Sequence, residues 1–402
     1  MKTKARGAMM RYRKLLVTPC LLSVVLLTFF MNAKTIGAQA VYAANAVKMC
    51  SPWSVVASPN PGNDTNGLAG VAAVSTNNVW AVGSTQTNGV VQTLTEHWNG
   101  SQWSVVASHG PASESQLSAV AVVPGTKQLW AVGEYFDTYW HTLTLHWNGS
   151  QWVLVPSPSM VGQFNFLIGV TAISAKDIWA VGNVYNGNNT NTLTMHWDGS
   201  QWSIVPSPNP SSFYNTLNAV TSISKNDVWA VGAYNGTNGQ PSLIEHWNGT
   251  SWSIVSGPSP SQAFNTLNAI ARVPGTKQLW AVGYYFATPN SSTPLTLIEQ
   301  WNGKQWSVVS SPSPGTGFSV LQGVVAVSAR DVWAVGYESP GEIPIVTLVE
   351  HWNGTSWSVI SSPNPDNAAT LYAVTRVPGT HKLWAVGGSN GEGGTLTESY
   401  CQ

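Results

Sequence analysis

Histidine recurs at one place in the sequence, and a repeated histidine first raises the question of a metal site. The members are His97, His146, His196, His246 and His351, with Gln300 at a sixth such place. Consecutive members lie about fifty residues apart, which puts them on separate structural repeats. Side chains on separate repeats cannot converge on one ion at bond lengths near ~2 Å. We therefore interpret them as packed, hydrogen-bonded structural residues and expect no metal and no cofactor.

A second group of reactive side chains breaks the repeat. The run EYFDTYWH brings together Glu134, Asp137, Tyr139, Trp140 and His141. Two carboxylates across a substrate can act as acid and base on a sugar, so Glu134 and Asp137 are candidates for a lyase or hydrolase. The same carboxylates beside aromatic rings also suit binding without catalysis, to a glycan or to a protein.

The fifth repeat carries a matching aromatic run, Tyr284, Tyr285 and Phe286. Other aromatic residues outside the repeat pattern are Phe164, Phe166, Phe213, Tyr214, Phe264 and Phe318. The candidate ligand-binding residues are therefore Glu134, Asp137, Tyr139, Trp140, His141, Tyr284, Tyr285 and Phe286.

The scaffold that must position these residues is indicated by a repeated tetrad, Trp-Ala-Val-Gly. It begins at Trp80, Trp130, Trp179, Trp229, Trp280, Trp333 and Trp384. A period near fifty residues is typical of propeller blades and is longer than that of most helical solenoids. Seven tetrads predict an all-β, seven-bladed β-propeller over residues 47–402.

Each period contains four short runs that are bounded by turn residues, and they predict four antiparallel strands, a to d. In the fourth repeat we expect strand a over 217–224, b over 228–233, c over 243–247 and d over 252–255. The a-to-b and c-to-d links are short and emerge together on what we call the hairpin face. The longer b-to-c and d-to-a links emerge on the opposite side, the loop face.

Tryptophan and glycine follow the same period. Of 21 Trp, only Trp140 lies outside the repeat. A large flat ring at equivalent places in every blade suits packing between sheets, where each ring buries about 150–250 Å². The Gly that ends each tetrad suits a position where another stretch of backbone approaches closely.

The pattern resembles the kelch-type blade of the galactose-oxidase central domain. A hydrophobic run ending in Gly, the Trp247-Asn248 step, a following Trp252 and a Pro-x-Pro exit at Pro208 to Pro210 occur in the kelch order. The resemblance covers about residues 52–400 and implies the propeller fold. It does not extend to copper chemistry, because no His pair is placed for the metal.

Charge is distributed unevenly. Without the basic N-terminal segment, ten Lys and Arg stand against 17 Asp and Glu, which disfavours a nucleic-acid partner. Eight acids outside the repeat are expected in b-to-c and d-to-a links: Asp64, Glu114, Glu134, Asp137, Glu338, Glu342, Asp366 and Glu392. Most basic residues fall in the short hairpins, so we expect a negative loop face that favours cations or basic partners.

The N-terminus has the pattern of an export signal. Residues 1–14 carry basic side chains and no acid, an apolar run spans 15–31, and small-residue sites follow at 38–40 and 44–46. Residues 1–46 are therefore predicted to be a cleaved signal or, alternatively, a membrane anchor through 15–31. Either alternative predicts a secreted or extracytoplasmic propeller, which we expect to be a monomer.

The two cysteines beyond this segment predict how the ring closes. In the repeat alignment Tyr400 replaces the strand-c Trp, and the Asn-Gly turn that should follow is cut between Cys401 and Cys50. Strand d of the last blade must then come from the N-terminus, beginning at Trp53. A Cys50–Cys401 disulfide would close the ring, and in the loop-entropy model it contributes at most roughly 5 to 6 kcal/mol.

The sequence thus favours a non-catalytic binding or interaction module that uses the loop face. A carbohydrate-active enzyme and a structural surface component stay as alternatives. A function on a symmetric scaffold resides in the residues that break the symmetry.

Overall fold

The computed structural model describes residues 52–236, 239–314, 317–339, 341, 345–365, 368–389 and 393–401. The chain divides into two units, Met1–Lys48 and Met49–Gln402, and all of these residues belong to the second. The predicted export segment 1–46, its apolar run 15–31 and Cys50 lie outside the described residues. Within the described ranges, no helix is long and apolar enough to cross a bilayer.

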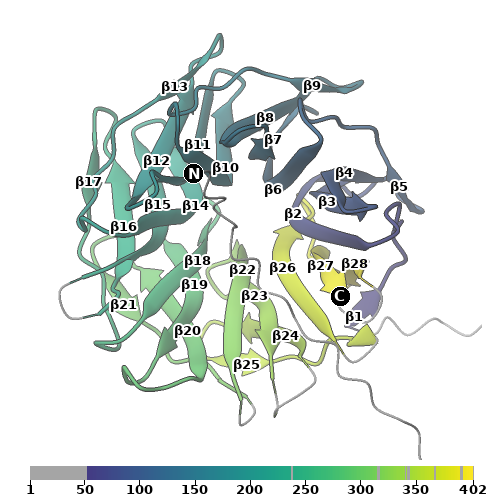
Figure 1. Ribbon diagram of the computed structural model, residues 1–402. Helices are drawn as coiled ribbons and strands as arrows, with labels where there is room; N and C mark the ends of the chain where they lie inside the picture. Colours follow the sequence, from purple (N-terminus) through teal and green to yellow (C-terminus); the bar gives the residue numbers. More distant parts are fainter. Residues whose placement is uncertain are drawn as a thin grey trace, which may run out of the picture. The chain divides into compact units, whose positions relative to one another are not determined.

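Seven four-stranded antiparallel sheets, the blades, surround a central axis (Figure 1). Blade 1 consists of β2 (Thr65–Ser75), β3 (Asn78–Thr87), β4 (Val90–Trp98) and β5 (Trp103–Val105). Blade 2 consists of β6 (Glu114–Val122), β7 (Leu129–Phe136), β8 (Trp140–Trp147) and β9 (Trp152–Leu154). Blade 3 consists of β10 (Phe164–Ser174), β11 (Asp177–Tyr185), β12 (Thr190–Trp197) and β13 (Trp202–Ile204). Blades 4 and 5 are β14 (Asn215–Ser224), β15 (Asp227–Tyr234), β16 (Ser242–Trp247), β17 (Trp252–Ile254); and β18 (Asn265–Arg272), β19 (Leu279–Phe286), β20 (Pro294–Trp301), β21 (Trp306–Val308). Blades 6 and 7 are β22 (Ser319–Ser328), β23 (Asp331–Glu338), β24 (Val346–Trp352), β25 (Trp357–Val359); and β26 (Ala369–Arg376), β27 (Leu383–Ser389), β28 (Gly394–Tyr400), completed by β1 (Trp53–Val55). The predicted strands of the fourth repeat agree with β14 to β17 within two residues.

The ring closes as predicted, because the first described strand is the outer strand of the last blade. Strand β1 pairs antiparallel with β28, with Trp53 opposite Tyr400 and Val55 opposite Glu398. Cys401 is disulfide-bonded. Its expected partner Cys50 lies outside the described residues, so that pairing stays a prediction.

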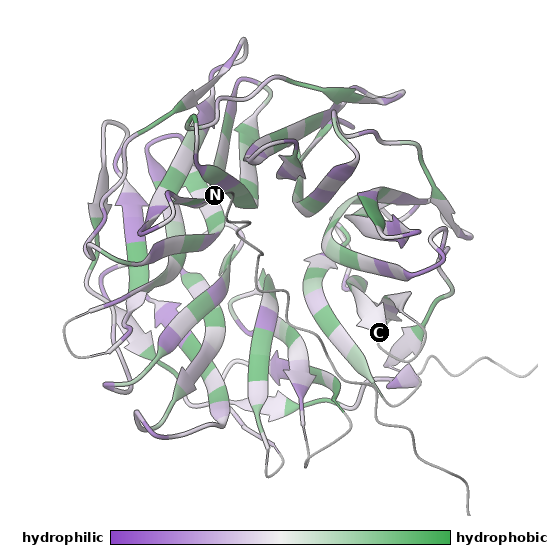
Figure 2. Ribbon diagram, viewed as in Figure 1, coloured by the Kyte–Doolittle hydropathy of each residue, from purple (hydrophilic) through white to green (hydrophobic). Residues whose placement is uncertain are grey.

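The hydrophobic core lies between the blades. Seven clusters of buried residues each join two neighbouring blades, including blade 7 to blade 1. Hydrophobic segments accordingly recur along the strands of every blade (Figure 2). A strand covered on both faces needs apolar residues on both, which explains why the Trp-Ala-Val-Gly strand does not alternate.

Three aromatic rings form the centre of each junction. Trp80 of blade 1 lies 4.4 Å from Trp147 and 5.5 Å from Trp152 of blade 2, measured between ring centroids. Such pairs contribute about 0.5–1.5 kcal/mol each beyond the area they bury. Between blades 6 and 7 the triad contains Trp333, Tyr400 and Trp53. Trp53 therefore stabilises the closure with the same contacts that the other junctions use.

The glycine of the tetrad is required by a bulge in strand a. In blade 1 the β2–β3 register shifts between Leu68 and Gly70, and every other blade shifts at the same place. The bulge presses backbone against strand b, so that a Cβ on Gly83 would lie 2.0 Å from the carbonyl oxygen of Gly67. No other residue fits there without a shift of the backbone.

Three of the recurring histidines are packed and hydrogen-bonded within their own blades, as expected. His196, His246 and His351 each place Nε2 2.9 Å from an Oδ1 of Asp177, Asp227 or Asp331, each within its own blade. Their rings pack on the tetrad Trp of that blade, with centroids 4.5, 4.4 and 4.1 Å away.

Candidate functional site

The loop face is built from b-to-c and d-to-a links, but some residues that we expected in those links lie in strands. Glu114 begins β6, Glu134 lies in β7 and Glu338 ends β23. The reason is that strands a and b continue past the bulge toward the loop face. Glu342, Asp366 and Glu392 fall outside the described residues, so the expected acidity of this face is only partly visible.

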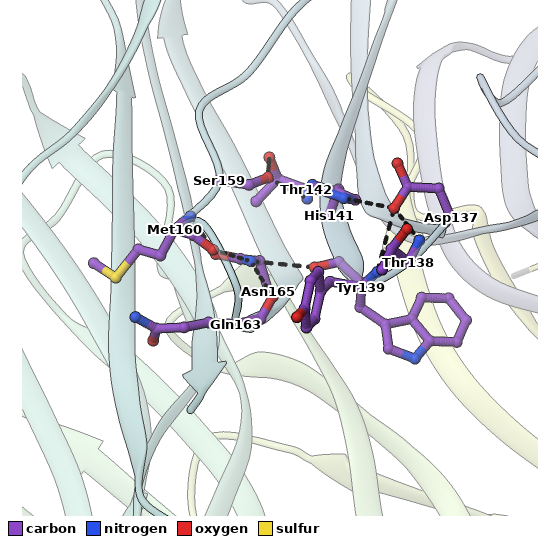
Figure 3. A network of polar contacts seen from close by, with 10 residues as sticks. Asp137, Thr138, Tyr139, His141, Thr142, Ser159, Met160, Gln163 and Asn165 are labelled. Atoms are coloured by element: carbon purple, nitrogen blue, oxygen red, sulfur yellow. Dashed lines mark hydrogen bonds and ion pairs between the residues drawn. The ribbon is translucent and has the colours of Figure 1, made fainter. Parts of the chain in front are cut away.

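The β7–β8 turn of blade 2 holds Asp137 in a polar network (Figure 3). The Asp137 carboxylate accepts from the backbone amides of Thr138 and Tyr139, and His141 Nε2 lies 3.0 Å from its Oδ1. Hydrogen bonds to the carboxylate hold the pKa of Asp137 below its usual range. The largest effect comes from the Thr138 amide, followed by the Tyr139 amide and then His141. His141 also stacks on Tyr135 at 5.0 Å. Asp137 is exposed and ionised, and its position is fixed.

Glu134, the other candidate carboxylate, lies in a different environment. It is 5% exposed in β7, opposite Gln116, and accepts a hydrogen bond from the Gln116 amide. Burial raises the pKa of Glu134 to about 7, against hydrogen bonds from Gln116 and Ser118 that lower it. Glu134 is therefore an interior group of blade 2, whereas Asp137 faces solvent.

Aromatic side chains of blades 2 and 3 contact one another in two rows at the junction between these blades. Trp140 lies 5.3 Å from Phe136 and 6.1 Å from Phe166. Phe164 lies 6.0 Å from Tyr139 and 6.1 Å from Tyr185. We call this set the aromatic band: Phe136, Tyr139, Trp140, Phe164, Phe166 and Tyr185. Because Trp140 is flanked by two rings, it is packed into the band and is not an isolated platform.

A tight turn beside the aromatic band displays an aliphatic side chain. The amide of Gln163 donates to the carbonyl of Met160 at 3.3 Å, and Gly162 at φ 73° occupies the position that favours glycine. Asn165 fixes the turn, accepting from the Met160 amide at 2.8 Å and donating to the Trp140 carbonyl at 3.1 Å (Figure 3). Val161 at its tip is 94% exposed.

The next two d-to-a links also display aromatic rings. Phe213 is 68% exposed and Phe264 is 48% exposed. Their backbones are held, since the Thr190 amide donates to the Phe213 carbonyl at 2.8 Å and the Phe286 amide donates to the Phe264 carbonyl at 2.9 Å. A pocket of about 590 Å³ lies beside Phe213, between Pro210 and Pro241 in blade 4.

The fifth-repeat residues do not join those of the second repeat. Tyr284, Tyr285 and Phe286 all lie in β19, where Phe286 contacts Tyr284 at 5.9 Å and Phe264 at 5.7 Å. Blades 3 and 4 stand between them and blade 2 in the ring. The sequence candidates therefore form two aromatic groups on the loop face, with Val161 and Phe213 on the links between.

A narrow axial channel is a feature that the sequence reasoning missed. A cavity of about 180 Å³ is lined by all seven innermost strands. The bulged residues supply one side chain per blade to it: Ala69, Ser118, Ile168, Asn218, Asn268, Gln322 and Tyr372. Asn218 and Asn268 donate to the carbonyls of Leu267 and Leu321 in the following blade, at 2.9 and 2.8 Å. The sequence signal for this channel was the residue after the Leu of each strand a, which varies between blades while its neighbours repeat.

The basic residues lie on the hairpin face, as expected. The basic residues of the hairpins are Lys127, Lys176, Lys225, Lys277, Arg330 and Lys382, and Lys304 lies between β20 and β21. All of these are on the hairpin face, opposite Asp64 and Asp137. Among the described residues, no group of three or more His, Cys, Asp or Glu could hold a metal ion.

The fold defines the class, a seven-bladed β-propeller with four antiparallel strands per blade. No protein-family model and no curated protein matches the chain. A solved structure of YCF48 bound to D1 peptide is 13% identical, covers 88% of this chain and 97% of that chain, and has a TM-score of 0.53. YCF48 from Cyanidioschyzon merolae is 15% identical over 87% of this chain and 98% of that chain, with a TM-score of 0.52. YjhT is 12% identical over 75% and 99%, with a TM-score of 0.47.

Proposed function

We propose that the protein is a non-catalytic binding module that recognises a polypeptide through the loop face. The observation that carries the proposal is the display of Val161, Phe213 and Phe264 on loops whose backbones are hydrogen-bonded in place. Exposed apolar side chains on ordered loops lose little conformational freedom when a partner covers them. Clustered aromatic anchors are typical of protein-binding surfaces.

The chemistry of the exposed side chains favours a polypeptide over a glycan. Val161, Phe213 and Phe264 carry no hydrogen-bonding side-chain groups, whereas a sugar site needs polar groups beside each ring. Trp140, the ring that best suits a sugar, is packed between Phe136 and Phe166. YCF48, a structural neighbour, has been solved with a D1 peptide, which supports a polypeptide ligand for this architecture.

The electrostatics favour a partner with basic side chains. Asp137 and Asp64 are exposed on the loop face, and the hairpin lysines lie on the opposite one. Catalysis by Glu134 and Asp137 is disfavoured, because Glu134 is an interior group of β7 while Asp137 faces solvent. An exported location, secreted or tethered through residues 15–31, remains part of the proposal. The disulfide-bonded Cys401 supports an oxidising compartment.

Selection of a displayed peptide library on the purified protein tests the proposal. We expect selected peptides rich in apolar and basic residues, and we expect Val161→Ser with Phe213→Ser to weaken their binding about tenfold or more. Val105→Ser with Val308→Ser is the matched control, since these valines are 45% and 43% exposed on outer strands away from the loop face. Equal losses in both double variants, or a glycan array signal without peptide binding, would contradict the proposal.

A further inference from the structure

A pocket of about 480 Å³ opens on the hairpin face, where blades 1 and 2 meet. Blade 1 contributes Asn78, Trp80 and His97 to its lining, and blade 2 contributes Lys127 and Trp147. This pocket lies on the opposite face from the proposed polypeptide site and is argued independently of it.

The orientation of the Asn78 amide is fixed by its neighbours. Trp80 Nε1 donates to Asn78 Oδ1 at 2.8 Å, and His97 Nε2 lies 3.0 Å from the same oxygen. An indole N–H can only donate, so the atom it meets must be the amide oxygen. Burial lowers the pKa of His97, which keeps the ring neutral with its proton on Nε2. The other polar atom of the Asn78 side chain is Nδ2, and it donates a hydrogen bond to no residue that the structure describes.

Blades 3, 4 and 6 have an aspartate at the position of Asn78, and in blades 4 and 6 it bonds both the tetrad Trp and the strand-c His. Asp227 Oδ1 accepts from Trp229 Nε1 at 2.7 Å and lies 2.9 Å from His246 Nε2, which repeats the bonds of Asn78. The second carboxylate oxygen thus stands where Asn78 has its Nδ2. In blade 6 that oxygen, Oδ2 of Asp331, lies 3.4 Å from Nδ1 of His381 in the next blade. An acceptor therefore meets a donor across the junction of blades 6 and 7.

At the junction of blades 1 and 2 the acceptor is missing. Lys127 stands three residues before its tetrad Trp, as His381 does in blade 7 and Lys277 does in blade 5. Within the described ranges, no carboxylate lies within ion-pair distance of Lys127. Asn78 and Lys127, whose side chains carry the N–H donors Nδ2 and Nζ, therefore line one pocket, whereas blades 3, 4 and 6 have an aspartate at the position of Asn78.

We infer that this pocket binds the carboxylate of an acidic sugar, whose oxygen accepts from both Asn78 Nδ2 and Lys127 Nζ. The carboxylate supplies to Lys127 the acceptor that Asp331 supplies to His381 from within the chain at the junction of blades 6 and 7. Trp147 is partly exposed in the same lining and offers a flat ring for the C–H face of the sugar. The amide and hydroxyl groups of Asn77 and Ser75 can bond the sugar hydroxyls.

Calorimetric titration with D-glucuronate and D-glucose tests the inference on the intact protein. We expect one site for glucuronate, and glucose weaker by about tenfold or more because it lacks the charged acceptor. Asn78→Asp should abolish glucuronate binding while keeping the fold, since Asp227 and Asp331 make the same bonds. Lys127→Gln should weaken binding about tenfold or more, and Lys277→Gln is the matched control that should not.

A gain of function makes the test sharper. Asp227→Asn gives the junction of blades 4 and 5 the two donors of blades 1 and 2, because Lys277 stands at the place of Lys127. Trp229 and His246 keep their oxygen partner, so the blade should remain folded. We expect the glucuronate stoichiometry to rise from one to two. Equal binding of glucose and glucuronate, unchanged binding in Asn78→Asp, or an unchanged stoichiometry in a folded Asp227→Asn would overturn the inference.

Discussion

Gly387 in β27 lies so close to the backbone of Thr370 in β26 that a Cβ on Gly387 would be 1.9 Å from the Thr370 carbonyl oxygen, although its partner in the ladder is Leu371. The adjacent Gly388 has ample space, since its nearest atom would be 3.7 Å away. The bulge between Leu371 and Ala373 causes this difference, because it pushes one strand-a carbonyl toward strand b. The same bulge supplies Tyr372 to the axial channel, so one backbone irregularity sets both the tetrad glycine and the channel lining.

This pair gives a sharp prediction about stability. Gly387→Ala should lower the free energy of unfolding by about 1–3 kcal/mol or more, because backbone must move to admit the methyl group. Gly388→Ala should change it by less than about 1 kcal/mol, and in the stabilising direction, because it restricts only the unfolded chain. Urea unfolding of both variants measures the difference. Equal losses would show that the bulge does not set the requirement.

Much of the fold could be predicted because the repeat reports the same physical constraint seven times. The spacing of the tetrads gave the blades, and the positions of Trp53 and Tyr400 gave the closure. The site was harder, because it depends on where strands end. We expected Glu134 in a link between strands, but β7 continues past Gly133 and the Glu134 side chain is buried. The amino-acid composition does not mark where β7 ends. Asn78 and Lys127 line the same pocket only because blades 1 and 2 are neighbours. Which atom of the Asn78 amide is left to donate depends on its contacts within the blade.

The closing strand gives a second prediction. Trp53 is 1% exposed and packs on Trp333 and Tyr400, so Trp53→Ala should cost about 3–5 kcal/mol of unfolding free energy. Val55→Ala in the same strand should change little, because Val55 is 47% exposed. Chemical unfolding followed by tryptophan fluorescence compares them. If both variants were equally stable, β1 would not carry the closure.

The disulfide at Cys401 gives a third prediction. Peptide mapping without reductant should recover a Cys50–Cys401 cross-link. Reduction should lower the unfolding free energy by up to about 6 kcal/mol, because the bond closes a very long loop. The measurement is thermal unfolding with and without reductant, with Cys401→Ser as a variant that reductant should not affect. Recovery of Cys50 as a free thiol would remove the covalent closure, although the β1–β28 pairing would stand.

Buried carboxyl groups in strand c give the last prediction, on pH. Glu245 is fully buried opposite Ala230, and neither of its oxygens has a hydrogen-bond partner among the described residues. Burial raises its pKa from 4.5 to about 8. Below pH 4.5 the group is protonated in both states. Between pH 4.5 and 8 only the unfolded chain releases the proton, so stability falls by at most about 1.4 kcal/mol per pH unit and then levels off.

Blades 2 and 3 already carry the replacement that tests this, since Leu145 and Met195 occupy the same strand-c position. Glu245→Met should therefore fold, and its advantage in unfolding free energy over the unchanged protein should be small at pH 5 and grow toward pH 8. Urea unfolding across that range measures the slope, with Glu114→Gln at the start of β6 as the control. An advantage that does not change with pH would mean that the buried carboxyl finds a partner in solution, because only an unpartnered group keeps its proton that far above pH 4.5.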